Sequence, residues 1–208
     1  MARIYLFSAA ALVAAMLGGL LYVVVMGGPA SDDQFAQCRA SQVASGSGDI
    51  GGPFELVHHE GHTVTEEDVI TKPTLIYFGY TFCPDVCPLD NARNAQAVQM
   101  LSERGRDAQP VFITVDPKRD TPEVMADFVP AFHPEMIGLT GSDEQVRAAA
   151  QAYRAFYNAH EADDDFYLVD HSTFTYLMMP EHGFVEVFRR DEGVEALADR
   201  VACYIDAA

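Results

Sequence analysis

Runs of apolar residues along this chain are separated by amphipathic and polar segments, and the pattern predicts a mixed α/β domain. The segments TLIYFGY at Thr74–Tyr80 and VFITV at Val111–Val115 are nearly continuous in apolar and aromatic residues, which is typical of strands buried on both faces. Shorter runs of the same kind predict further strands at Phe54–Val57, Met136–Leu139, Phe174–Met179 and Phe184–Phe188.

Helices are predicted between these strands and at the end of the chain. The pattern predicts helices at Asn91–Arg104 and Gly193–Ile205, and Thr121 caps another because a proline follows it at the first helical position. Ser142 begins a further helix through a capping box with Gln145. Alternating strands and helices favour a sheet with crossover helices. The closing β-β-α, after a β-α-β opening, is the order of a thioredoxin-like fold.

The first long apolar run, Ile4–Met26, contains 23 residues without a charge. A helix of that length rises roughly 34 Å at about 1.5 Å per residue, and the hydrocarbon core of a bilayer is about 30 Å thick. A cleaved signal peptide is the alternative, but its apolar region would normally have only about 7–15 residues. We therefore expect one uncleaved transmembrane helix at the N-terminus.

The charges on either side of this run predict its orientation. Arg3 precedes it, whereas Asp32 and Asp33 follow it, so the positive-inside bias keeps the N-terminus in the cytoplasm and exports the rest. We expect a single-pass protein of the bacterial inner membrane with a periplasmic C-terminal domain. The expected parts are a cytoplasmic start at 1–3, an anchor at 4–26, a tether at 27–52 and the folded domain at 53–208.

The composition narrows the range of partners. The chain has 13 basic and 31 acidic side chains, which gives a net charge of −18 at pH 7. A body of this charge repels phosphate backbones, so we exclude nucleic acid as a partner.

Candidate chemistry is concentrated in the segment YFGYTFCPDVCPLD, in which Cys83 and Cys87 are separated by three residues and each is followed by a proline. Pro88 fits the first position of a helix with Cys87 as its cap. Both sulfurs would then lie at the positive end of the helix, which favours thiolates. Three interpretations fit this spacing: two structural cysteines, a redox dithiol, and soft ligands for copper(I) or zinc.

Two thiolates leave a metal site incomplete, and the seven histidines of the chain are candidates for the third ligand. His58, His59 and His62 lie in a polar turn, where we expect them to be solvated. His171, in FYLVDHSTFTYLMM, stands just before a predicted strand, and in thioredoxin-like folds the loop entering this strand packs against the cysteine turn. His171 is therefore a candidate ligand, and a loop histidine bonded to backbone is the alternative.

The segments TLIYFGYTFCPDVCP, VFITVDPKRDTPE and VDHSTFTYLM together resemble the Sco/SenC family of copper chaperones, over roughly Pro53 to Ile205. The resemblance implies a membrane-anchored thioredoxin-like fold that binds one copper per chain, as Cu(I), Cu(II) or both. It implies Cys83, Cys87 and His171 as the ligands. It also implies a role in assembling the CuA site of cytochrome c oxidase subunit II.

The resemblance leaves a second role open. Family members act as metal donors, as thiol-disulfide reductants of the target cysteines, or as both, so Cys83 and Cys87 are also a candidate redox pair that forms a disulfide in the oxidised, metal-free state. Other periplasmic copper chaperones and thiol reductants are further candidate partners. A thiol peroxidase on the same fold is a competing interpretation. We favour an assembly factor over a turnover enzyme.

Three more residues carry predictions. Asp170 precedes His171 and is a candidate acceptor for the other N–H of its ring, but a surface role is the favoured interpretation. Cys38 and Cys203 lie outside the matched segments. In an oxidising compartment we expect them to form a second disulfide that fastens the tether to the last helix.

Overall fold

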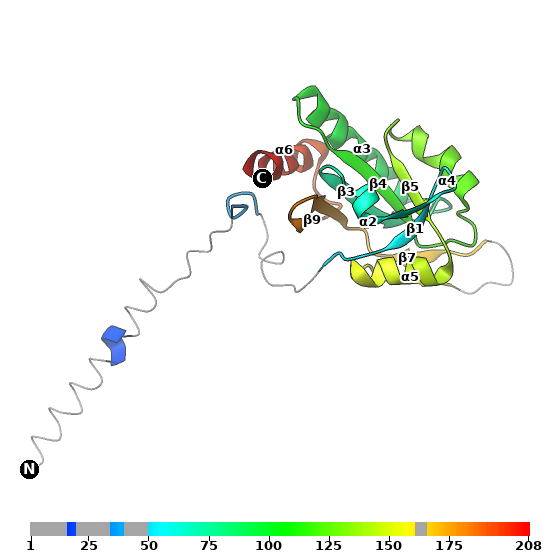
Figure 1. Ribbon diagram of the computed structural model, residues 1–208, viewed down its shortest axis with the longest axis horizontal. Coiled ribbons are helices and arrows are strands. Elements are labelled where there is room, and N and C mark those ends of the chain that lie inside the picture. Colours follow the sequence, from blue (N-terminus) through cyan, green and yellow to red (C-terminus); the bar gives the residue numbers. More distant parts are fainter. Residues whose placement is uncertain (1–15, 20–33, 40–49, 161–165) are drawn as a thin grey trace, which may run out of the picture. The chain divides into compact units, whose positions relative to one another are not determined.

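The structure of the chain is a computed structural model that describes residues 16–19, 34–39, 50–160 and 166–208 (Figure 1). Residues 1–34 and 35–208 form two separate units, and in the first of these residues 16–19 are helical. The predicted anchor at 4–26 otherwise lies outside the described residues. In the part of the chain that is described, no helix is long and apolar enough to cross a membrane.

A seven-stranded sheet with the strand order β2-β1-β5-β4-β3-β8-β9 forms the centre of the domain. Its strands are β1 at Glu55–His58, β2 at Thr63–Thr65, β3 at Thr74–Gly79, β4 at Gln109–Thr114, β5 at Ile137–Thr140, β8 at Thr175–Met179 and β9 at Gly183–Phe188. The three central strands β3, β4 and β5 are parallel, and an antiparallel hairpin lies at each edge. The carboxyl ends of the parallel strands therefore meet at one edge of the sheet, where the candidate site lies.

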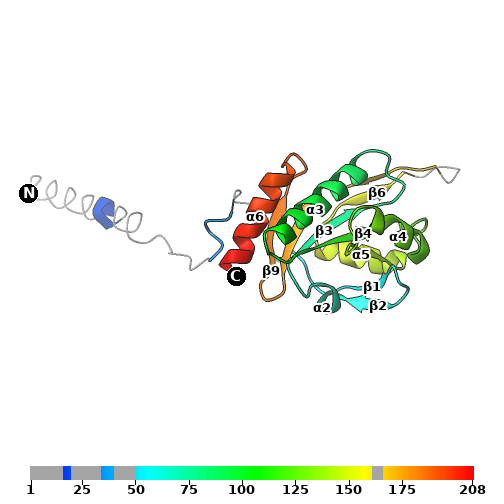
Figure 2. The ribbon, with the colours of Figure 1, turned by 90° about the horizontal axis from the view of Figure 1, so that it is seen from above.

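Helices cover both faces of this sheet (Figures 1 and 2). The helix α3 and the C-terminal helix α6 pack beside each other on one face, whereas α5 lies on the other. The helical segments are α2 at Glu66–Val69, α3 at Val86–Glu103, α4 at Pro122–Phe128, the 3₁₀ turn η2 at Val129–Ala131, α5 at Asp143–Ala152 and α6 at Val194–Ala207. A separate two-stranded sheet pairs β6 at Tyr157–Ala159 with β7 at Val169–His171.

The continuous apolar runs fill both layers of the core. Leu75 of β3 packs with Leu101 of α3 and Leu197 of α6. Phe78 of the same strand lies in the other cluster, where its ring is 5.5 Å from that of Tyr153 at the end of α5. Each fully buried side chain of this size stabilises the fold by about 1.5–3 kcal/mol. The strand is therefore covered on both faces, as its composition predicts.

The segment 35–39 belongs to the same unit as the sheet, whereas the sequence predicts that it is part of the tether. Phe35 and Cys38 are buried, and the Phe35 ring lies 5.3 Å from the ring of Tyr204 in α6. Cys38 and Cys203 are joined by a disulfide that links positions 165 residues apart. The bond fastens this segment to the C-terminal helix α6. The sequence predicts this pairing of Cys38 with Cys203.

Candidate metal centre

The turn that carries the two cysteines follows β3 and leads directly into α3. Its backbone begins with a hydrogen bond from the Cys83 N–H to the Tyr80 carbonyl. Gly79 ends the strand beneath Cys87, and a Cβ at Gly79 would lie 2.9 Å from the Cys87 sulfur. A larger residue there would displace the thiol, so the glycine gives Cys87 its place over the end of the strand.

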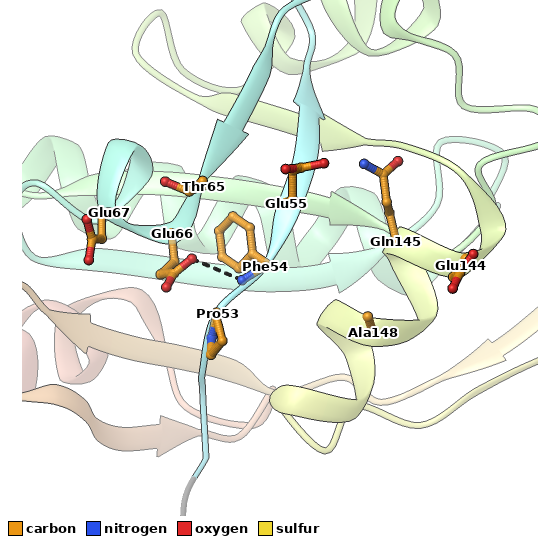
Figure 3. A pocket seen from close by; sticks show the side chains of 9 residues that line it. All are labelled: Pro53, Phe54, Glu55, Thr65, Glu66, Glu67, Glu144, Gln145 and Ala148. Carbon is orange, nitrogen blue, oxygen red and sulfur yellow. Dashed lines mark hydrogen bonds between the residues drawn. The ribbon is translucent and has the colours of Figure 1, made fainter.

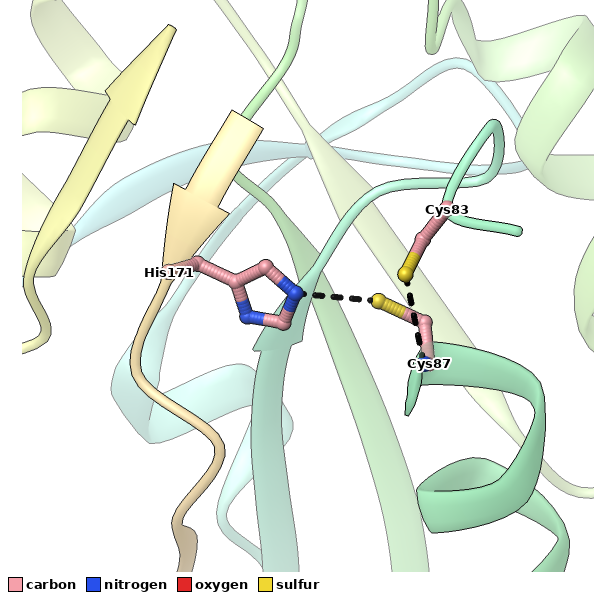
Figure 4. Close-up of side chains that lie close together, drawn as sticks. All are labelled: Cys83, Cys87 and His171. Carbon is pink, nitrogen blue, oxygen red and sulfur yellow. Dashed lines mark hydrogen bonds between the residues drawn. The ribbon is translucent and has the colours of Figure 1, made fainter. Parts of the chain in front are cut away.

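The helix begins earlier than the sequence predicts. Its cap is Asp85 and its first residue is Val86, so Cys87 and Pro88 both lie in the first turn, and the prediction of Cys87 as the cap is wrong. Proline is tolerated there because the first four N–H groups of a helix have no partner within the helix. The Cys87 N–H instead points at the Cys83 sulfur, at 3.4 Å. The two sulfurs are thus held together by the helix start (Figure 4).

His171 is the last residue of β7, and its side chain points toward the two cysteines. Its Nε2 lies 3.2 Å from the Cys87 sulfur, and its Nδ1 lies 2.9 Å from the Ser172 carbonyl (Figure 4). Because a carbonyl only accepts hydrogen bonds, Nδ1 carries the proton and Nε2 presents its lone pair to the sulfurs. The rings of Tyr77 and Tyr80 stand edge-on to the imidazole at 6.0 and 5.8 Å.

Cys83, Cys87 and His171 therefore form a group that could hold a metal ion, with one ligand atom from each residue and all three atoms within 4.8 Å of one another. Two sulfurs and one imidazole are ligands suited to copper(I) or zinc. The set leaves a coordination position for a ligand from another molecule, because zinc prefers four ligands and three are supplied here.

The structure gives Asp170 the surface role and not the orienting one. The Asp170 carboxylate lies 2.8 Å from Nε2 of His160, and both side chains are exposed. Successive side chains of a strand point to opposite faces, so Asp170 points away when His171 points toward the cysteines. The backbone carbonyl of Ser172 takes the orienting role that was assigned to Asp170.

Burial sets the charge of Cys87 and His171 before a metal binds. Cys87 is 0% exposed and Cys83 is 7% exposed. Burial raises the pKa of the Cys87 thiol, and it lowers the pKa of His171. At neutral pH Cys87 is therefore a thiol and His171 is a neutral imidazole. A bound cation would supply the charge that stabilises the buried thiolate.

Copper binding is therefore expected to strengthen as the pH rises. The proton on Cys87 must leave when the sulfur binds metal, and the raised pKa means that it is still present at neutral pH. For each proton released, affinity increases about tenfold per pH unit below the pKa. Calorimetric titration in buffers of different ionisation enthalpy measures the protons released. An affinity that did not change between pH 6 and pH 8 would contradict this account.

Two carboxylates beneath the site were not singled out from the sequence. Asp90 of α3 is buried and accepts a hydrogen bond from the Tyr77 hydroxyl at 3.0 Å. Asp120 is fully buried between the cysteine turn and β4, where it accepts the Thr81 N–H at 3.0 Å and the Thr114 hydroxyl at 2.6 Å. The backbone carbonyl of Asp120 accepts the hydroxyl of Thr140. Asp120 therefore fastens the cysteine turn to the ends of two parallel strands.

Replacing Asp120 with alanine is expected to lower the free energy of unfolding by about 3 kcal/mol, because it leaves the buried hydroxyl of Thr114 and the partly buried donors of Thr81 without an acceptor. Chemical denaturation measures the change. Asp127→Ala, at an exposed position of α4, is the matched control and should change stability by less than about 0.5 kcal/mol. If the two substitutions lowered the free energy of unfolding equally, the role of Asp120 in anchoring the cysteine turn would be contradicted.

A pocket elsewhere on the domain lacks the cysteine and histidine ligands of the candidate metal centre. It is lined mainly by polar and acidic side chains from β1, α2 and α5, with Glu66 accepting the Phe54 N–H at 3.0 Å (Figure 3). No cysteine or histidine lines it. We therefore place the candidate chemistry at the cysteine turn.

Comparison with known proteins places this geometry in a family. Residues 42–206 match the SCO1/SenC family. The chain belongs to that family. Protein SenC of Rhodobacter capsulatus is 54% identical over 179 residues, which are 86% of this chain and 80% of SenC. The mitochondrial SCO1 homolog 1 of Arabidopsis thaliana is 45% identical over 159 residues, which are 76% of this chain but only 48% of that protein.

Solved structures of SCO1/SenC proteins share the fold. Copper-bound ScoI of Arabidopsis thaliana superposes with a TM-score of 0.71 at 44% identity, covering 74% of this chain and 98% of that one. Copper-bound yeast Sco1 superposes with a TM-score of 0.72 at 36% identity, covering 77% and 90%. The thioredoxin-like fold and the family resemblance predicted from the sequence are confirmed. Both relatives carry copper, and this chain has a Cys83, Cys87 and His171 group that could bind a metal.

Proposed function

We propose that this chain is a membrane-anchored copper chaperone that assists assembly of the CuA centre of cytochrome c oxidase subunit II. It binds one copper, as Cu(I), Cu(II) or both, through Cys83, Cys87 and His171. The observation that carries the proposal is the convergence of these three ligand atoms within 4.8 Å, with Nε2 of His171 facing the sulfurs. The copper-bound relatives favour copper over zinc at this ligand set.

The proposed target rests on relatives and on the chemistry of transfer. BsSco, which shares the fold at 20% identity and a TM-score of 0.61, is a member of the Sco family of cytochrome c oxidase assembly proteins. Three ligands leave the ion open to a fourth from a partner, so the ion can pass by exchange of ligands. Phe82 and Leu89 beside the two cysteines are 53% and 60% exposed and offer apolar contacts to such a partner.

The proposed location is the bacterial inner membrane, with residues 1–3 in the cytoplasm, an anchor at 4–26 and the domain in the periplasm. The uncharged run Ile4–Met26 with Arg3 before it supports the anchor and its orientation. The disulfide between Cys38 and Cys203 supports an oxidising compartment.

A thiol-disulfide reductase is the second candidate, because the sulfurs of Cys83 and Cys87 lie within 4.8 Å of each other and two free thiols so placed can form a disulfide. Reactive redox cysteines have lowered pKa values, whereas burial raises the pKa of Cys87. This difference favours metal binding as the main role.

The experiment that separates the two roles is complementation of a strain that lacks this protein, with oxidase activity and CuA content as the readouts. A chaperone requires all three ligands, so His171→Ala and Cys83→Ser should both abolish rescue. A reductase requires only the thiols. Rescue by His171→Ala together with failure of Cys83→Ser would therefore support the reductase and contradict the proposal. His160→Ala, an exposed histidine outside the site, is the control that should rescue fully.

A further inference from the structure

The hairpin between β1 and β2 gathers a second set of metal-ligand side chains. Its turn has the sequence HHEGH, and the sequence predicts that these histidines are solvated. In the structure one ligand atom each from His58, Glu60 and His62 lies within 4.8 Å of the others. The rings of His58 and His62 stack with centroids 4.7 Å apart, and Nδ1 of His58 lies 3.6 Å from the Glu60 carboxylate.

The backbone of the turn holds these side chains in place. The His58 N–H donates to the His62 carbonyl at 2.8 Å, and the Gly61 N–H returns to the His58 carbonyl at 2.8 Å. Gly61 has a φ of +88°, a conformation that glycine adopts at little cost. The Glu60 N–H donates to Nδ1 of His58 at 3.1 Å, which fixes the orientation of that ring. The three side chains are therefore brought together by the fold of the turn.

A further contact attaches this turn to the sheet. The ring of His59 stacks on that of His58 with centroids 4.2 Å apart, and its Nδ1 accepts the Gly138 N–H at 3.0 Å. The His59 N–H donates in turn to the Gly138 carbonyl at 2.9 Å. His59, which is hydrogen-bonded to β5, thus supports the His58 ring. The side chain of His58 is only 14% exposed. Glu60 and His62 are exposed, which leaves an open path for an ion.

This cluster lies at the opposite edge of the sheet from the cysteine turn. The cysteine turn follows the carboxyl end of β3, which runs parallel to β4 and β5. β1 runs antiparallel to β5, with His58 opposite Leu139, so its turn extends past the amino end of β5. The sheet separates the two groups, and neither shares a ligand with the other.

The donor set differs in chemistry from the thiolate site. Two imidazoles and a carboxylate suit borderline divalent ions such as Cu²⁺ and Zn²⁺, whereas thiolates suit Cu(I) as well as zinc. In the neutral ring of His58, Nδ1 accepts the Glu60 N–H, so an ion that binds through Nδ1 replaces this hydrogen bond.

We propose that His58, Glu60 and His62 form a second metal site, which binds one divalent ion of the Cu²⁺ or Zn²⁺ type independently of the cysteine site. The function proposed above does not require this site, and this site does not require that function.

The test is a Cu²⁺ titration of the full chain carrying Cys83→Ser and Cys87→Ser, which removes both thiolates, followed by electron paramagnetic resonance. We expect one Cu²⁺ per chain, with nitrogen couplings from imidazole. Adding His62→Ala or Glu60→Gln should weaken binding by at least about tenfold. Both positions are exposed, so the fold should be retained, and unchanged thermal unfolding checks this.

The matched control is His160→Ala in the same background, which should leave the Cu²⁺ affinity unchanged because this exposed histidine lies outside the cluster. Absence of bound Cu²⁺ in the serine variant would overturn the second site. So would an affinity that His62→Ala and Glu60→Gln leave unchanged. Because the cysteine ligands are absent throughout, none of these outcomes bears on the proposed chaperone function.

Discussion

His171→Ala is expected to weaken copper binding by more than about 100-fold, because the loss of a direct ligand should exceed the 10–100-fold cost typical of losing an outer-shell partner. The variant leaves two thiolates, because among the described residues no other His, Cys, Asp or Glu side chain joins the two sulfurs in a group that could hold a metal. Competition against a chromophoric Cu(I) chelator measures the affinity. The fold should survive, since the ring contributes edge contacts to Tyr77 and Tyr80, one hydrogen bond to a carbonyl and the contact of Nε2 with the Cys87 sulfur.

Asp170→Asn is the matched control for this prediction. It changes the residue next to His171, but its side chain contacts His160 and leaves the ligand ring alone. Copper affinity should therefore stay at the wild-type value. If Asp170→Asn weakened binding as strongly as His171→Ala, the corrected assignment of the orienting group to the Ser172 carbonyl would be wrong.

Cys38→Ser is expected to lower the free energy of unfolding by about 2–5 kcal/mol. The disulfide closes a loop between positions 165 residues apart, so its loss frees a long stretch of the unfolded chain. It also releases Phe35 from its packing against Tyr204. Chemical denaturation under non-reducing conditions measures the change. Copper affinity should remain that of the wild type, because the bond packs against α6 and not against the cysteine turn.

Cys203→Ser and the double variant provide the control for this second prediction. Both remove the same bond, so each should lose as much stability as Cys38→Ser, and the double variant should lose no more than either single one. Losses that added in the double variant would show that the two cysteines act separately. That result would contradict the pairing seen in the structure.

The sequence predicted the central strands because their signals are strong. Thr74–Tyr80 and Val111–Val115 are apolar over their whole length, and β3 and β4 lie within a residue or two of these ranges. The hairpin of β6 and β7 was not predicted, since Tyr157–Ala159 is short and only partly buried. The strand β6 is held in place by pairing with β7, and no local sequence pattern reveals this pairing. This hairpin delivers His171 to the site.

The candidate ligands could be found from the sequence, but the groups that orient them could not. The spacing of Cys83 and Cys87 and the VDHS segment are visible in the chain. Asp120 stands in a charged stretch where a solvated side chain is the ordinary expectation, yet it is fully buried beneath the cysteine turn. Its role depends on contacts with Thr81 and Thr114, which are distant in sequence. Tertiary hydrogen bonds of this kind leave no periodic signal.

The measurement that tests the central claim most directly is X-ray absorption at the copper edge on the copper-loaded protein. The account predicts two sulfur ligands and one imidazole nitrogen at the copper of the Cys83, Cys87 and His171 group. A spectrum of the Cu(I)-loaded protein without sulfur ligands, or with two sulfurs and no imidazole, would contradict it.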